Sequence, residues 1–371
     1  MTNRIHCIWC KSKELSDVFE TDYSTPIASY MDDTCDNSEF IPYNVQKCEK
    51  CLSYQIKYVA DPAKVYKKNH AYSYGTTLKD MCLLFTDMII SSNIHSIVEV
   101  GAGNGFLADQ ILSAKPDIHY SIVDPTYIGN RNNRTVIDSF IEDYDVLTVE
   151  NDAVVLSHVF EHLYEPSNIL TMFKSMKHLK HIFLNMPNLE LYVQKNTFHV
   201  LNTEHTYFVE NDFLEAFFRK HGFQLEKKVF FKEHSVFFHF IKSDISLEED
   251  QLKNKYSEEL ISNFFNNIKN ITNKINQITD GHPIYMWPCS MHNQFILNFG
   301  VNADSITALL DNSSEKIGKY LYGFPKPCLG FETIISMNKP STIILNGGCF
   351  NIEIKKMLAA RHCDNINFIY I

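Results

Sequence analysis

The chain has 371 residues, of which 45% are hydrophobic and 21% charged, a composition typical of a globular protein with two or three hydrophobic cores. Lys and Arg number 34 against 44 Asp and Glu, so the formal net charge is −10. Such a surface repels phosphate backbones and anionic lipids, so we expect neither nucleic acid nor a membrane as a partner. The sequence shows no signal peptide and no membrane span, and we expect a cytoplasmic protein.

Four of the ten cysteines form two pairs with the same spacing, Cys7-x-x-Cys10 and Cys48-x-x-Cys51. Cytosolic thiols stay reduced, so paired cysteines favour a metal site over disulfides. Two such turns can offer four thiolates at the corners of a tetrahedron, which predicts Zn²⁺ bound by all four. Four protein ligands leave no position for a substrate, so we expect this zinc to be structural. Unligated thiols or a redox-active pair are the alternatives, and Cys35 is not assigned as a ligand.

The middle of the chain predicts alternating strands and helices. The polar segment 22–46 predicts loops, and an apolar period of three to four predicts a helix over residues 78–91. A strand over 96–100 then leads through a glycine-rich turn into a helix over 106–113. Further strands are expected at residues 120–123, 153–156 and 181–184. This alternation is typical of an α/β protein with a parallel sheet.

The remainder of the chain predicts an edge hairpin, a helix and a second α/β series. Residues 227–231 and 235–241 predict an antiparallel pair that closes the sheet. Residues 247–279 are polar with apolar positions at helical spacing, which predicts a long linking helix. Strands are then expected at residues 283–287, 305–310 and 342–345.

The glycine-rich turn carries the first indication of a cofactor. Glu99 precedes Gly101, Gly103 and Gly105, and small residues before a helix N-terminus let a ligand approach the backbone. Asp124 ends the next strand, where a carboxylate can accept hydrogen bonds from ribose hydroxyls. A glycine turn in an unrelated α/β protein is the alternative. The E-x-G-x-G-x-G pattern with the strand-terminal Asp resembles class I S-adenosyl-L-methionine-dependent methyltransferases.

Two later segments are similar to the same enzymes. Leu156-Ser-His-Val-Phe-Glu-His162 resembles the segment after their fourth strand, and Asn185-Met-Pro-Asn188 occupies a strand end that faces substrate. The resemblance implies S-adenosyl-L-methionine as the cofactor. It implies a binding set of Glu99, Gly101, Ala102, Gly103, Asn104, Gly105, Asp124, Pro125 and His158.

Over nearly its whole length the chain resembles the sugar C-methyltransferase family. The matching parts are the cysteine pairs, the Tyr-rich segment 70–74, the segment 202–208 and the C-terminal segment 310–323. The resemblance implies an α/β fold with a class I methyltransferase Rossmann-like core. The implied division is a zinc-binding domain over 1–70, a methyltransferase domain over 71–245, a linking helix over 246–280 and a C-terminal Rossmann-like α/β domain over 281–371. Ser290-Met-His-Asn293 stands where a nucleotide-binding unit would have a glycine-rich loop, so we expect no second cofactor there.

In this family the substrate is a 4-keto sugar on a nucleoside diphosphate. A base removes the proton next to the ketone, and the enolate carbon takes the methyl group. The family's catalytic histidine corresponds to His205, with Glu204 orienting the site and Tyr72 or Tyr74 stabilising the oxyanion. We expect a small-molecule nucleotide-sugar substrate and a monomer or homodimer.

One position departs from the family pattern. Asn202 replaces the family's Tyr three residues before the histidine, and its amide can donate to an oxyanion but does not titrate. This leaves open another sugar, or O- or N-methylation of a surface-glycan precursor. A non-catalytic zinc-containing scaffold is the rival class, although the intact set of Glu99, three glycines and Asp124 disfavours it. A zinc-containing nucleic-acid methyltransferase is disfavoured by the net charge.

Overall fold

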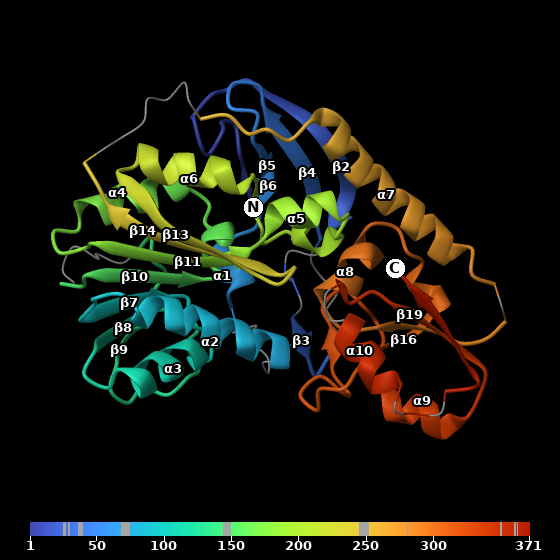
Figure 1. The fold of residues 1–371 in the computed structure, drawn as a ribbon. Helices are drawn as coiled ribbons and strands as arrows, with labels where there is room; N and C mark the ends of the chain where they lie inside the picture. Colours follow the sequence, from blue (N-terminus) through green and yellow to red (C-terminus); the bar gives the residue numbers. More distant parts are fainter. Residues whose placement is uncertain are drawn as a thin grey trace.

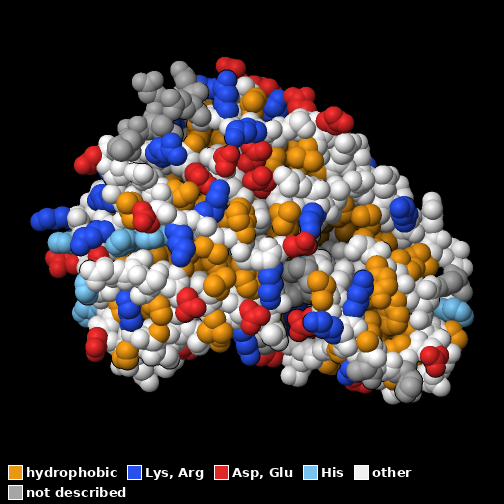
Figure 2. All heavy atoms as spheres, in the orientation of Figure 1, with side chains coloured by type: hydrophobic (Ala, Val, Ile, Leu, Met, Phe, Trp, Pro, Cys, Tyr) orange, Lys and Arg blue, Asp and Glu red, His pale blue; other side chains and the backbone are white. Residues whose placement is uncertain are grey.

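The computed structural model of the protein shows three sheets of four or more strands with helices around them (Figure 1). It describes residues 1–371 except 25–26, 29, 36–39, 68–74, 144–149, 245–251, 280, 349–350, 360 and 362. None of the described helices is both long and apolar enough to cross a membrane. Figure 2 shows Lys and Arg interspersed with Asp and Glu over the face in view.

The largest sheet has seven strands in the order β13-β14-β11-β10-β7-β8-β9. Its strands are β7 (Ser96–Val100), β8 (His119–Val123), β9 (Thr135–Ile137), β10 (Ala153–Ser157), β11 (His181–Pro187), β13 (Phe223–Phe231) and β14 (Ser235–Lys242). The strands from β7 to β11 are parallel, and β14 lies antiparallel beside β11. This is the Rossmann-like arrangement expected of a class I methyltransferase, so the predicted fold class is confirmed.

Helices cover both faces of this sheet (Figure 1). The helices α2 (Thr76–Ile90) and α3 (Phe106–Ala114) pack on one face, and α4 (Pro166–Ser175) and α6 (Asn211–Lys220) pack on the other. Aromatic contacts fill both layers: Phe85 of α2 meets Phe237 at a ring-centroid distance of 5.0 Å, and Phe218 of α6 stacks on Phe240 at 4.0 Å. The parallel strands therefore lie between two apolar layers, and the strand ends remain for a site.

The N-terminal part contains more regular structure than the polar sequence predicts. A four-stranded sheet has the order β12-β5-β4-β2, with β2 (Leu15–Ser24), β4 (Ile41–Cys48), β5 (Tyr54–Ile56) and β12 (Tyr207–Phe208). The prediction of loops over 22–46 is therefore wrong at both ends of that range. The polar side chains of β2 lie on an edge strand, where half the positions face solvent, and this conceals the strand in the sequence. Three short elements, β1 (Thr2–Asn3), β6 (Tyr58–Val59) and α1 (Pro62–Val65), complete this part.

The C-terminal part is a parallel sheet of five strands in the order β18-β16-β15-β19-β20. The elements are β15 (Ile284–Trp287), β16 (Ile306–Asp311), β18 (Leu329–Gly330), β19 (Ser341–Leu345), β20 (Ile366–Tyr370), α8 (Met291–Asn298), α9 (Phe331–Met337) and α10 (Asn351–Leu358). The predicted second α/β series is confirmed. A short pairing of β3 (Met31–Asp32) with β17 (Tyr320–Leu321) ties the N-terminal part to it.

The linking helix is shorter than predicted. Helix α7 (Glu258–Asn276) begins after Ser257, whose hydroxyl accepts a hydrogen bond from the N–H of Leu260 at 3.1 Å as an N-cap. Leu252 and Tyr256, which continue the apolar period, are buried but precede the helix. Residues 245–251 lie outside the described part of the chain.

Candidate functional site

The glycine turn connects β7 to the N-terminus of α3. Gly101, Gly103 and Gly105 have φ values of +67°, +61° and +77°, which favour glycine because other residues are strained there. Asn104 accepts a hydrogen bond from the N–H of Phe106, the first residue of α3, at 3.1 Å, and Gly105 is the N-cap of that helix. The turn therefore has the backbone geometry that a closely bound ligand requires.

Asp124 lies directly after β8 and is tied to the glycine turn. One carboxylate oxygen accepts a hydrogen bond from the N–H of Gly103, and the other accepts one from the N–H of Thr126, both at 2.7 Å. Burial raises the pKa of Asp124 against these hydrogen bonds. The carboxylate thus fixes the loop. The hydroxyl of Thr126 also donates to Oδ1 at 3.4 Å, so Oδ2 is the oxygen that keeps a second lone pair able to accept a hydrogen bond from a ribose hydroxyl. Pro125 follows in a half-buried position.

Glu99 points into the core. Its side chain is buried and accepts a hydrogen bond from the hydroxyl of Tyr120 at 2.7 Å. Burial raises the pKa of Glu99 to about 7. Glu99 thus contacts the buried residues that pack against the glycine turn. Ala102 of that turn is buried in the same cluster as Tyr120. A direct contact of Glu99 with a cofactor stays a prediction.

The segment after β10 lies against the glycine turn. A Cβ atom added at Gly101 would come within 2.6 Å of the side chain of Val159, so the two segments touch. His158 before it has a φ of +55°, and its Nδ1 lies 3.3 Å from a carboxylate oxygen of Glu161. The 3-10 helix η2 (Phe160–His162) carries Glu161 and His162 toward the same strand ends.

The predicted base lies on a turn just before β12. Nδ1 of His205 contacts the carbonyl oxygen of Val200 at 2.8 Å, and since only an N–H can pair with a carbonyl, Nδ1 carries the proton. This tautomer leaves Nε2 with its lone pair. Burial, then the neighbouring His162, lowers the pKa of His205 to about 4, so the imidazole is neutral at pH 7.

Asn202 organises this turn. Its side-chain oxygen accepts hydrogen bonds from the N–H groups of Glu204 at 2.9 Å and His205 at 3.1 Å. Asn202 therefore positions the two residues that the family resemblance assigns to chemistry, a role that the sequence comparison with the family's Tyr did not anticipate. The carboxylate of Glu204 accepts a hydrogen bond from the N–H of Ala28 at 2.7 Å, which ties the turn to the N-terminal part.

Glu161, His162 and His205 come together although they derive from two distant segments. One ligand-type atom of each lies within 4.8 Å of the others. Nδ1 of His162 is also 2.9 Å from the hydroxyl of Tyr66 and 3.7 Å from Glu204. Burial raises the pKa of Glu161. The surrounding imidazoles lower this pKa by more than burial raises it, so it lies below its ordinary value.

The sequence analysis did not assign a role to Glu161, His162 or Tyr66. The signal for the first two was the Phe-Glu-His segment itself, which begins three residues after β10 and belongs to a stretch that resembles methyltransferases. Tyr66 carried no signal. Tyr72 and Tyr74 lie outside the described residues, and their predicted role is not addressed by the structure.

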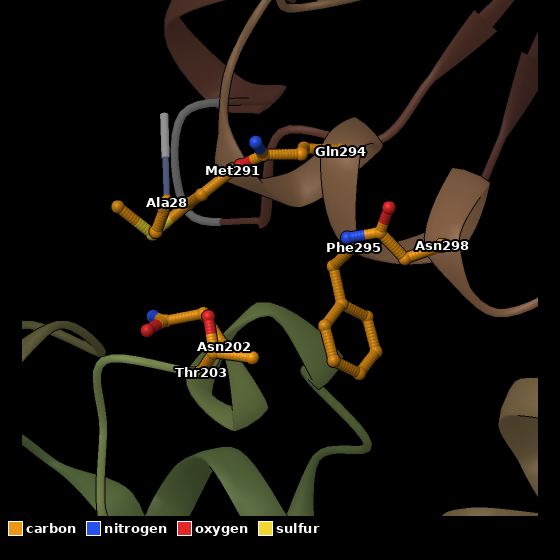
Figure 3. A pocket seen from close by; sticks show the side chains of 7 residues that line it. All are labelled: Ala28, Asn202, Thr203, Met291, Gln294, Phe295 and Asn298. Carbon is orange, nitrogen blue, oxygen red and sulfur yellow. The ribbon is translucent and has the colours of Figure 1, made fainter. Parts of the chain in front are cut away.

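The C-terminal part faces the His205 turn across a small pocket. Figure 3 shows Asn202 and Thr203 on one side and residues of α8 on the other. The pocket is lined by Ala28, Asn202, Thr203, Met291, Gln294, Phe295 and Asn298. The C-terminal part thus forms one wall of this pocket next to the turn.

The N-terminal part also contacts the His205 turn directly. The buried guanidinium of Arg4 donates hydrogen bonds to the carbonyl oxygens of Thr206 at 2.7 Å, Tyr164 at 2.9 Å and Ile56 at 3.3 Å. The N–H of Ile56 donates to the same Thr206 oxygen at 3.0 Å. The ring of Trp9 packs edge-on against Tyr207 at 4.7 Å. Residues near the cysteine pairs therefore set the position of the turn.

The four predicted metal ligands converge. The Sγ atoms of Cys7, Cys10, Cys48 and Cys51 all lie within 4.8 Å of one another, and the distances of Cys7 to Cys51 and of Cys10 to Cys48 are 3.5 Å. Zn–S bonds of about 2.3 Å in a tetrahedron separate sulfurs by roughly 3.8 Å, so the four thiols fit such an ion. Both turns have the same backbone form.

In each turn, the chain reverses direction at the fourth residue after the first cysteine, which has a positive φ. Lys11 and Leu52 occupy these positions with a φ of +60° each, and their N–H groups donate to the carbonyl oxygens of Cys7 and Cys48 at 2.9 and 2.8 Å. Among the described cysteines, Cys35 is exposed and apart from this cluster, which agrees with its exclusion from the ligand set.

Residues 66–228 match a family model described as a methyltransferase domain. The match covers less than half of the chain. The matched segment holds the glycine turn, the segment that follows β10 and the His205 turn, whereas the cysteine pairs and the five-stranded sheet lie outside the match. No curated protein sequence matches the chain.

The solved structures that match this chain do so with low sequence identity and low TM-scores. An O-methyltransferase family protein from Burkholderia thailandensis has 14% identity and a TM-score of 0.37, covering 46% of this chain and 57% of that chain. The 1,6-didemethyltoxoflavin-N1-methyltransferase of the same organism, solved with S-adenosylhomocysteine, has 8% identity and a TM-score of 0.37, covering 54% of this chain and 96% of that chain. The chain thus spans little more than half of the first relative, and scores this low support no conclusion about substrate.

Proposed function

We propose that this chain is an S-adenosyl-L-methionine-dependent methyltransferase that acts on a nucleotide-activated keto-deoxy sugar. The observation that carries the proposal is the contact of Val159 with Gly101, because it brings the histidine and glutamate cluster next to the glycine turn of a methyltransferase domain. A cofactor turn and a group able to accept a proton then share one end of the sheet.

The residues proposed to hold the cofactor fit it chemically. The three glycines leave their parts of the turn without side chains, and the first turn of α3 presents N–H groups. Oδ2 of Asp124 keeps a lone pair for a ribose hydroxyl. When bound, S-adenosyl-L-methionine supplies an electrophilic methyl group on a sulfonium.

His205 is proposed as the base. Its Nε2 accepts the proton from the carbon next to the ketone, so a C–H bond breaks, an N–H bond forms and the electron pair passes to the enolate. The enolate carbon would then form the bond to the methyl group as the bond from that methyl to the sulfonium sulfur breaks and S-adenosylhomocysteine leaves. Glu161 and Glu204 stabilise the imidazolium because both carboxylates lie near the imidazole pair. A pKa of about 4 makes His205 a weak base, because burial and the neighbouring His162 outweigh the two carboxylates that raise this pKa.

The four cysteines are proposed to hold a structural Zn²⁺. Their sulfurs are close enough for one tetrahedral ion, and such a site supplies folding free energy rather than chemistry. Because the adjoining residues contact the His205 turn, the ion would act on catalysis only through position.

Two measurements test the proposal. Calorimetry with S-adenosylhomocysteine should give binding heat, and its absence together with an unchanged melting temperature would reject the cofactor. Mass spectrometry of nucleotide sugars incubated with S-adenosyl-L-methionine should then show one added methyl group, placed by NMR on carbon. Methylation at oxygen or nitrogen would favour the glycan-precursor alternative.

A variant tests the base. His205→Asn should lose turnover and keep near-normal binding of S-adenosylhomocysteine, because the histidine is assigned to proton transfer alone. His221→Asn is the matched control: its Nδ1 also contacts a backbone carbonyl, that of Phe217 at 2.8 Å, but it lies outside the cluster. Equal activity of wild type and His205→Asn would remove His205 as the base.

A further inference from the structure

Glu161 is a buried carboxylate that lacks sufficient partners. Its side chain is fully buried, and neither oxygen has a hydrogen-bond donor in the described part of the chain. Nδ1 of His158 is 3.3 Å away but does not meet hydrogen-bond geometry. Burying an ionised carboxylate without hydrogen bonds is costly, and proteins offset that cost with a paired charge or a metal ion.

Two histidines beside Glu161 are held in the manner of metal ligands. Nδ1 of His205 is engaged by the carbonyl of Val200, and Nδ1 of His162 is engaged by Tyr66 at 2.9 Å, with Glu204 at 3.7 Å. Histidines that bind metals almost always use their second nitrogen in this way, because the outer contact fixes the tautomer and the ring orientation. The carbonyl fixes Nε2 of His205 as the nitrogen that remains to bind a cation, and Nε2 of His162 remains in the tautomer in which Nδ1 donates to Tyr66.

We propose that Glu161, His162 and His205 bind a divalent transition-metal cation, at a site separate from the four cysteines. Two imidazoles and one carboxylate are a ligand set used for Fe²⁺ and similar cations, with positions left open for oxygen donors. Bonds of about 2.1 Å would place the three ligand atoms roughly 3.0 to 3.4 Å apart. They now lie within 4.8 Å, so small side-chain movements close the site.

The cation site has a consequence for the proposed base. Nε2 of His205 has one lone pair, which binds either a proton or a cation. A loaded site therefore cannot enolise a keto sugar through His205, and cation binding suppresses that reaction. The cation site goes beyond the proposed function and stands on its own geometry whether or not the substrate is a sugar.

The test uses the full chain, purified with zinc on its cysteines, and Mn²⁺ as the probe. Mn²⁺ prefers nitrogen and oxygen ligands to thiolates, so it discriminates against the cysteine site. Electron paramagnetic resonance of free Mn²⁺ should show one cation bound per chain. Glu161→Gln, which keeps shape and removes charge, should weaken the binding by roughly tenfold or more, and His162→Asn should do the same. His221→Asn should bind like wild type.

The outcomes separate the two proposals. Equal Mn²⁺ affinity of wild type and Glu161→Gln, with both folded by their melting curves, overturns the cation site. Binding accompanied by loss of methyl transfer, restored by removal of the Mn²⁺, supports both the site and the base. Binding with increased transfer supports the site and overturns the base role of His205. S-adenosylhomocysteine binding is measured on the same samples, and its absence rejects the proposed cofactor without bearing on the cation.

Discussion

Arg4 offers the sharpest test of how the N-terminal part supports the His205 turn. The guanidinium is buried and donates to three backbone carbonyls, and burial lowers its pKa only to about 10, so it is charged at neutral pH. Arg4→Met keeps much of the aliphatic packing and removes all three donors. The carbonyl of Thr206 still accepts from the N–H of Ile56, whereas the carbonyl of Tyr164 loses the donor from Arg4.

The size of the effect follows from these contacts. A hydrogen bond to a charged group contributes about 1.5 to 3 kcal/mol, and an orphaned buried acceptor costs about 1 to 3 kcal/mol. Arg4→Met also removes a buried charge and its desolvation cost, which offsets part of this loss. We therefore expect the free energy of unfolding to fall by about 2 to 4 kcal/mol. The His205 turn should also loosen, which lowers kcat more than it raises KM.

Urea denaturation followed by the fluorescence of Trp9 measures the loss. Trp9 packs on Tyr207 beside the turn, and a Trp287→Phe background leaves it as the single tryptophan. Arg361→Met is the matched control, because Arg361 forms a surface ion pair with Glu332 that contributes at most about 1 kcal/mol. If Arg4→Met and Arg361→Met destabilise the protein equally, the turn does not depend on Arg4.

Three further predictions concern other parts of the chain. Burial, with His181 and Lys227 adding to it, lowers the pKa of His239 from 6.5 to about 4, so stability is lost as the pH falls through that interval. In urea titrations, the free energy of unfolding should fall between pH 7.5 and pH 5 by about 2 kcal/mol less in His239→Phe than in wild type. An equal fall in both proteins would contradict this. Gly103→Ala adds strain of about 1 to 2 kcal/mol at a φ of +61° and should abolish S-adenosylhomocysteine binding by calorimetry, whereas Gly75→Ala, with open space around it, should bind normally. Cys48→Ser should lose the zinc measured by atomic absorption, whereas the control Cys363→Ser should keep one zinc per chain. Retention of one zinc per chain in Cys48→Ser would exclude Cys48 as a ligand.

The parts of the fold that sequence predicts are those with a local period. The strand before Gly101, the helix after Gly105 and the parallel series around them carry their own apolar patterns, so their order and type could be predicted. The two-residue strand β12 could not, because Tyr207 and Phe208 pair with β5 across about 150 residues and two residues have no period. Helix α7 was predicted too long because buried Tyr256 continues the apolar period ahead of the Ser257 N-cap.

The residues of the candidate site also fall into those that the sequence could predict and those that it could not. The glycine turn and the cysteine pairs have spacings that follow from their chemistry, so the residues could be named from the sequence. Glu161 acquires its significance only from burial and from the approach of His205, which is 44 positions further along the chain. From the sequence alone, Glu161 looks like an ordinary residue that follows a strand.

The His205 turn is fixed from three directions by parts of the chain outside the predicted base itself. Arg4 and β5 hold Thr206 from the N-terminal part, and Ala28 holds the carboxylate of Glu204. Helix α8 faces Asn202 across the pocket in Figure 3. Because a misplacement of about 1 Å can cost a hundredfold in rate, the geometry of this turn depends on the whole chain. The proposed base thus lies within the matched residues 66–228, while the flanking parts of the chain hold its turn in place.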